Sequence, residues 1–139
     1  VIPLPPLTVC HQCGRDRDRR RDHHGCVVVH EPADLGLAID AAHKLAERGK
    51  QVRVVSMPCS EIFDQQPEEY RETVFPKKIS RRLAVEAAHR DYWYKYVGLR
   101  GRIVGMDAFG ESAPAGDLLR EFGFTVENVI SVAQELFQQ

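Results

Sequence analysis

Cysteine and histidine residues near the N-terminus have a spacing that could bind zinc. Cys10 and Cys13 form a C-x2-C pair, and His23 and Cys26 follow after a short loop. Thiolates and imidazoles are the ligands that Zn²⁺ takes in tetrahedral sites. The loop between the two pairs is a run of Arg and Asp without the apolar or glycine residues that usually support such a site. We interpret the four residues as accidental thiols and imidazoles, and keep a small zinc-binding protein as the alternative.

Two serines have positions at which anions could bind. Ser60 and Ser112 each follow a strand-like segment and precede a helix-like one. In open α/β sheets small ligands bind beyond the carboxyl ends of the strands, and helix N-termini attract anions. Ser60 and Ser112 are therefore candidates for an anion-binding site in a free-standing regulatory module. The simpler interpretation is that both serines are N-caps, and that the neighbouring Cys59 is a small packing residue.

Aromatic residues cluster in one short segment of the chain. Trp93, Tyr94 and Tyr96 could form a platform for a ligand, but aromatic clusters more often fill a core or an interface. We expect these side chains to pack within the domain, with contact to a partner domain as the second interpretation.

The composition changes near residue 27. Residues 1–26 form an atypical lead, whose middle, Arg15–Asp22, has charged residues and no apolar periodicity, and we expect it to be disordered. A second hypothesis is a reading-frame error. A shift of one base turns many Arg, Asp and His codons into Val, Ala, Thr and Ile codons, so that Arg15–Gly25 would encode a buried strand with a glycine turn. The sheet would then lack its first strand.

Residues 27–139 are expected to form one domain of alternating strands and helices. Predicted strands span 27–29, 52–56, 83–85 and 103–104, and predicted helices span 35–46, 60–64, 67–74, 114–122 and 126–137. Asp34, Ser60 and Thr125 are predicted N-caps, and Gly49 and Gly123 are predicted to end helices in the left-handed conformation. Short apolar strands that alternate with helices favour a mainly parallel sheet covered on both faces.

The bulk composition restricts the class of protein. The chain has 139 residues, of which 43% are hydrophobic and 28% charged, and its net charge is -1. We expect one soluble domain, and neither nucleic acid nor a membrane as partner. Prolines stand near the first residue where a signal peptide would have a charged segment and a long apolar run, so we expect no signal peptide and cysteines in a reducing compartment.

An ordered series of short segments resembles the C-terminal domain of transketolase of the bacterial and plant type. The likeness runs from Asp34 to the end. It departs from the family at Val27–Ala33, which lacks the usual Gly-Ser-Glu turn. The matching segments are Arg53–Pro58 (RVVSMP), Phe63-Asp64, Glu69–Glu72 (EYRE), Ala84–Ala87 (AVEA), Asp91–Leu99 (DYWYKYVGL), Phe109–Ala115 (FGESAPA) and Glu121–Val126 (EFGFTV).

The resemblance implies a three-layer α/β/α sandwich with a mixed, mainly parallel sheet. It also implies a parent enzyme, a cytoplasmic homodimer, that transfers a two-carbon ketol unit between sugar phosphates of the pentose phosphate pathway. Thiamine diphosphate and Mg²⁺ would be bound by the other domains of that enzyme. The motifs that bind them do not occur in this chain. We therefore assign it no catalytic and no cofactor-binding residue, and expect the chain alone to be inactive.

Overall fold

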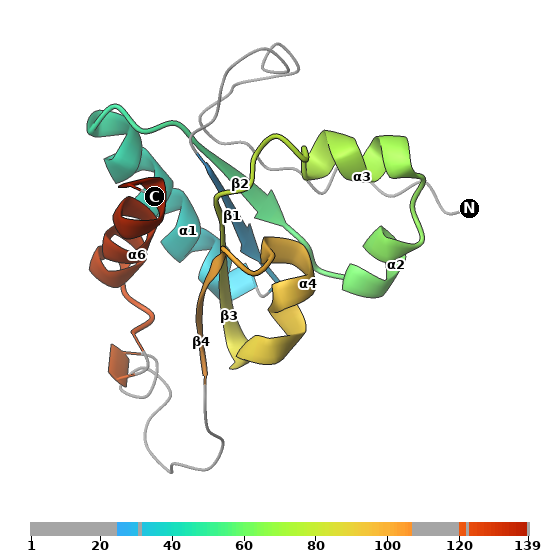
Figure 1. Cartoon of the computed structure of the whole chain (residues 1–139). Coiled ribbons are helices and arrows are strands. Elements are labelled where there is room, and N and C mark those ends of the chain that lie inside the picture. The colour runs from blue at the N-terminus through green and yellow to red at the C-terminus, as the bar shows by residue number, and fades with distance from the viewer. Residues whose placement is uncertain (1–24, 31, 107–119, 122, 139) are drawn as a thin grey trace.

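The computed structural model describes residues 25–30, 32–106, 120–121 and 123–138. Its centre is a four-stranded sheet in the order β2-β1-β3-β4. Each neighbouring pair of these strands is parallel. The strands are β1 (Gly25–Val29), β2 (Val52–Ser56), β3 (Arg82–His89) and β4 (Arg102–Met106) (Figure 1).

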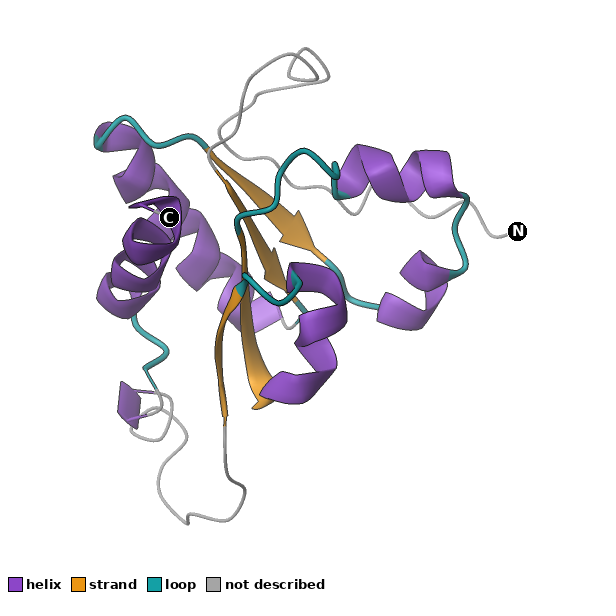
Figure 2. Cartoon of the chain, in the orientation of Figure 1, coloured by secondary structure: helices purple, strands orange, loops and turns teal. Residues whose placement is uncertain are grey.

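Helices cover both faces of this sheet. Helices α1 (Pro32–Glu47) and α6 (Val126–Gln138) lie together on one face (Figure 2). The other face carries α2 (Ser60–Asp64), α3 (Glu68–Val74), the 3-10 helix η2 (Arg90–Trp93) and α4 (Tyr94–Val97). The predicted α/β class with three layers is confirmed. All strand pairs in the described part of the chain are parallel.

Alternation along the strands divides the core into two clusters. In β1, Val27 and Val29 pack toward α1 and α6, whereas Cys26 and Val28 pack toward the opposite layer. The two-residue repeat of a strand produces this division, because successive side chains point to opposite faces. A sheet buried on both sides therefore needs near-continuous apolar strands, which is what the sequence contains.

The core beneath α2, α3 and α4 is aromatic. Phe63, Phe75, Trp93 and Tyr96 are all buried within it. Phe63 meets the ring of Phe75 edge-on at 5.7 Å and that of Tyr96 at 6.1 Å between ring centroids. These rings fill the space that three short helices leave above the sheet, which confirms the packing interpretation for Trp93 and Tyr96. Tyr94 is instead 43% exposed.

Two predicted elements have the observed bounds, whereas β3 (Arg82–His89) extends four residues beyond its predicted end at 85. β2 and α2 have the predicted bounds, and Gly49 and Gly123 have φ angles of 78° and 84°. The Thr125 side-chain oxygen accepts a hydrogen bond from the backbone N–H of Asn128 at 3.2 Å, as an N-cap does. The predicted helix over 114–122 lies largely outside the described residues.

The predicted start of the first helix is wrong. α1 begins at Pro32, so Asp34 lies inside its first turn instead of capping it. Proline is well suited to the first helical position, because its missing N–H would have no partner there and its φ angle is already helical. Asp34 remains favourable at this place, since a negative charge stabilises the amino end of a helix.

The first strand begins earlier than the composition predicted. Gly25 and Cys26 belong to β1, although the sequence analysis placed them in the lead, and both are buried. A Cβ atom on Gly25 would come within 2.1 Å of the Phe137 ring of α6. The glycine thus permits close packing of α6 on the strand. β1 occupies an inner position of the described sheet.

Candidate functional site

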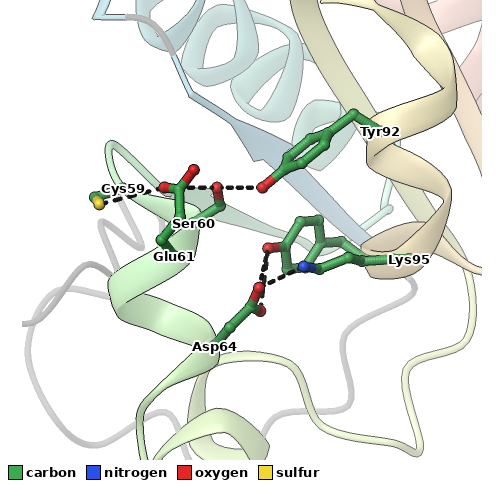
Figure 3. Close-up of polar contacts among 7 residues, drawn as sticks. Cys59, Ser60, Glu61, Asp64, Tyr92 and Lys95 are labelled. Carbon is green, nitrogen blue, oxygen red and sulfur yellow. Dashed lines mark hydrogen bonds and ion pairs between the residues drawn. The ribbon is translucent and has the colours of Figure 1, made fainter.

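Polar side chains from two helices meet beyond the carboxyl ends of the strands. α2 follows β2, and η2 with α4 follows β3. Because the strands are parallel, these helices start at the same edge of the sheet. Figure 3 shows side chains of α2 and its N-cap facing Tyr92 and Lys95 of η2 and α4. This edge is where the sequence placed its anion-binding candidate Ser60.

Ser60 contacts a distant tyrosine instead of capping its own helix. Its hydroxyl lies 2.6 Å from the hydroxyl of Tyr92, and Tyr92 is the donor when the Ser60 hydrogen is directed to Glu61. The N-cap of α2 is Cys59, and no side-chain capping bond is present. The predicted capping role of Ser60 is therefore wrong. Its side chain is directed to Tyr92, 32 residues further along the chain, in a contact that joins α2 to η2.

A carboxylate lies directly beside this serine. Glu61 Oε2 accepts hydrogen bonds from the Ser60 hydroxyl at 3.3 Å and from the Cys59 thiol at 3.5 Å. Its own backbone N–H, followed by these two donors, holds the pKa of Glu61 below the usual glutamate value. The carboxylate is thus ionised at neutral pH. A negative charge at this distance opposes an anion at Ser60.

A second group of contacts joins the same two helices. The Lys95 ammonium pairs with Asp64 Oδ2, and the Tyr96 hydroxyl donates to both Asp64 oxygens at 3.0 and 3.1 Å. The bond to Asp64 raises the pKa of Lys95 above its ordinary value. Burial is the main cause that raises the pKa of Tyr96. The Lys95 ammonium also lies 5.0 Å from the centre of the Tyr96 ring, within the range of a cation–π contact.

His30 connects the ends of the first two strands at this edge. Its Nδ1 lies 2.8 Å from the carbonyl oxygen of Met57. A carbonyl only accepts, so Nδ1 carries the hydrogen in this contact. The ring centroid of His30 is 6.1 Å from that of Trp93 in η2. The histidine therefore links β1, the end of β2 and η2.

Together these contacts position the short helices over the aromatic core. A helix of four or five residues has little stability of its own, so tertiary contacts must hold it. The Ser60–Tyr92 and Asp64–Tyr96 bonds, with the Lys95 pair, supply such contacts. The two short helices are thereby fixed to one another.

The remaining site predictions fall mostly outside the described residues. Ser112, Cys10, Cys13 and His23 all lie there, and Cys26 is buried in the core of the sheet. In the part of the chain that the structure describes, no group of three or more His, Cys, Asp or Glu side chains could hold a metal ion. Zinc and anion binding by these residues thus stay predictions. None of the described helices has the length and apolar character needed to cross a membrane.

Sequence reasoning missed the partners of this cluster. It assigned no element to 90–97 and no role to Tyr92, Lys95 or Asp64. The contacting residues are 31 or 32 positions apart, so no local spacing marks them. The one available signal was the dense aromatic segment, which predicted packing but not the polar partners of the rings.

The fold and this edge define a class of protein: a parallel α/β/α domain whose carboxyl edge is occupied by short packed helices. The chain belongs to the family described as the transketolase-like TK C-terminal domain, whose model matches residues 21–125. This match begins before Asp34, where the resemblance found in the sequence begins, and it includes β1. The predicted family is thereby confirmed.

Whole transketolases contain a region similar to this chain. Transketolase 1 from Aliivibrio fischeri is 52% identical over 110 residues, which are 79% of this chain and 17% of the relative. A transketolase structure from Leishmania mexicana has 44% identity and a TM-score of 0.73, covering 81% of this chain and 16% of that one. A transketolase mutant from Pichia stipitis has 29% identity and a TM-score of 0.78, covering 94% and 18%. The chain thus spans about one sixth of the relatives it matches.

Proposed function

We propose that this chain serves as the C-terminal, non-catalytic domain of a thiamine-diphosphate-dependent transketolase. The observation that carries the proposal is the match of the family model over residues 21–125 combined with coverage of only 17% of a whole relative. The parent enzyme would transfer a two-carbon ketol unit between sugar phosphates, as a homodimer in the cytoplasm. Its other domains would bind thiamine diphosphate and Mg²⁺.

The geometry of the described site supports a structural role. The polar side chains at the carboxyl edge are engaged with one another: Asp64 is paired with Lys95, and Glu61 supplies a further negative charge. Such an edge does not attract a diphosphate or a sugar phosphate. The chemistry of the parent enzyme would therefore reside in the domains that this chain supports.

The surface near α4 has apolar groups suited to contact with those domains. Leu99, just after α4, is 96% exposed, and Tyr94 of α4 is 43% exposed. A leucine exposed to this degree gives up its hydration on contact with another domain, and full burial of such a side chain contributes about 1.5–3 kcal/mol. We infer that this surface faces the remainder of the parent enzyme.

An activity and reconstitution experiment tests the proposal. The purified chain, supplied with thiamine diphosphate, Mg²⁺ and pentose phosphates, is expected to show no ketol transfer. The same chain, added to a transketolase from which the matching domain has been removed, is expected to associate with it and raise its activity. Leu99→Ser should weaken that association, whereas Arg71→Gln on the exposed surface of α3 should not. Turnover by the chain alone, or an absence of association, would contradict the proposal.

A further inference from the structure

A small cavity with two arginines lies at the opposite, amino-terminal edge of the sheet. Ser80, Arg81, Arg100 and Leu136 line it, and its volume is about 110 Å³. Arg81 directly precedes β3, and Arg100 lies two residues before β4. Because β3 and β4 are adjacent and parallel, the residues before them reach the same edge side by side.

The backbone on both sides of the cavity is fixed. The carbonyl of Arg81 accepts a hydrogen bond from the N–H of Cys26 at 2.9 Å. Arg100 lies in a tight turn in which the Gly101 N–H donates to the Gly98 carbonyl at 3.1 Å. Gly98 has a φ angle of 77°, which glycine adopts without strain. The two arginine side chains therefore start from rigid positions.

The guanidinium of Arg82, unlike that of the neighbouring Arg81, already donates hydrogen bonds within the domain. Arg82 donates to backbone carbonyls of Ile79, Tyr96, Phe75 and Pro76 and is thereby occupied. The side chains of Arg81 and Arg100 make no hydrogen bond or ion pair with any residue that the structure describes. Two arginines without a carboxylate partner among the described residues thus line one small cavity.

We propose that this cavity binds the phosphate group of a small phosphate-bearing ligand. The planar forks of two guanidiniums can donate paired hydrogen bonds to the oxygens of one tetrahedral anion, and the Ser80 hydroxyl adds a further donor. A space of 110 Å³ corresponds to roughly the share of four water molecules in the liquid. It suits one phosphate group, with the remainder of the ligand lying outside. The proposal does not depend on the proposed function.

The simpler role for these arginines is electrostatic support of α6. Leu136 belongs to the last turn of α6, and cations near the carboxyl end of a helix are favourable. That role needs positive charge only. It needs neither two guanidiniums nor a hydroxyl around one cavity, and it predicts no saturable binding of phosphate.

Titration with inorganic phosphate tests the proposal on the full chain. The side-chain Nε–H resonances of Arg81 and Arg100 are followed by NMR at constant ionic strength. We expect saturable shifts with a dissociation constant on the order of millimolar, because the site is open to water. Arg81→Gln and Arg100→Gln should each weaken binding about tenfold, and the double variant should abolish it.

The matched control is Arg71→Gln, which removes the same charge from α3 on the other side of the sheet. It should leave the dissociation constant unchanged, and thermal unfolding of each variant confirms that the fold is intact. Linear shifts without saturation, equal shifts with chloride, or equal weakening by Arg71→Gln would overturn the proposal. The two arginines would then only add positive charge to this surface or stabilise the carboxyl end of α6.

Discussion

Substitution of Gly25 tests whether this residue belongs to the sheet or to a disordered lead. A Cβ atom at this position would lie 2.1 Å from Phe137 Cε1, 2.8 Å from Phe137 Cζ and 2.9 Å from the carbonyl oxygen of Arg81. Carbon atoms in contact are separated by about 3.5–4.0 Å. The Phe137 ring must therefore move by more than 1 Å, roughly, in a part of the core that is closely packed.

The expected cost of Gly25→Ala is that of overpacking, about 1–3 kcal/mol in the free energy of unfolding. Urea unfolding followed by circular dichroism measures it. With a slope of about 2 kcal/mol/M, the midpoint should fall by roughly 0.5–1.5 M. Gly36→Ala is the matched control, because Gly36 lies in α1 with nothing within 4 Å of its added Cβ. It should stabilise the protein by about 0.5–1 kcal/mol.

A second substitution identifies the clash itself. Phe137→Leu shortens the ring that occupies the place of the added Cβ, so it should recover part of the loss in the Gly25→Ala background. The coupling between the two substitutions should be on the order of 1 kcal/mol. If Gly25→Ala leaves the midpoint unchanged while Gly36→Ala raises it, Gly25 is not packed beneath α6. The frame-shift hypothesis and a longer disordered lead would then regain support.

Three substitutions, one of them combined with a change of pH, test contacts of the same domain. Arg82→Leu removes the donors to four backbone carbonyls, so it should lower the free energy of unfolding in urea by about 2–4 kcal/mol. Arg81→Gln should change that free energy by less than about 0.5 kcal/mol. Equal effects of the two substitutions would contradict the difference in their contacts. The pKa values of Lys95 and Tyr96 are raised from 10.5 and 10.0, so their contribution to stability is complete below about pH 10 and is lost as the pH rises further. Urea midpoints measured between about pH 8 and about pH 11 should show this decline. In Lys95→Met the midpoint should fall less steeply with pH. If it falls as steeply as in the unaltered protein, the role of the pair between Lys95 and Asp64 is refuted.

Several elements could be predicted from the sequence because their signals are local. A short apolar run located β2, and a helical apolar pattern located the body of α6. Gly49 and Gly123 marked helix ends since only glycine readily adopts positive φ angles. Thr125 capped its helix as predicted, because an N-cap bond spans only three residues.

The candidate site was less predictable because side chains have competing partners. Ser60 has the residue type and position of an N-cap, yet its hydroxyl contacts Tyr92. Asp34 likewise has the type of a cap, but Pro32 lets the helix begin earlier. In each case the local preference is worth about 1 kcal/mol, so a tertiary contact or a better helix start can override it.

By itself the sequence determined the alternation of strands and helices, the three-layer class and the family, since these depend on residue types repeated along a continuous chain. Tertiary structure alone decided which side chains meet. The sheet order β2-β1-β3-β4 brings together residues that follow different strands. It places Ser60 beside Tyr92 at one edge and Arg81 near Arg100 at the other. These contacts join residues that are far apart in the chain and that crossover connections between parallel strands bring together. No periodic pattern in the sequence therefore marks them.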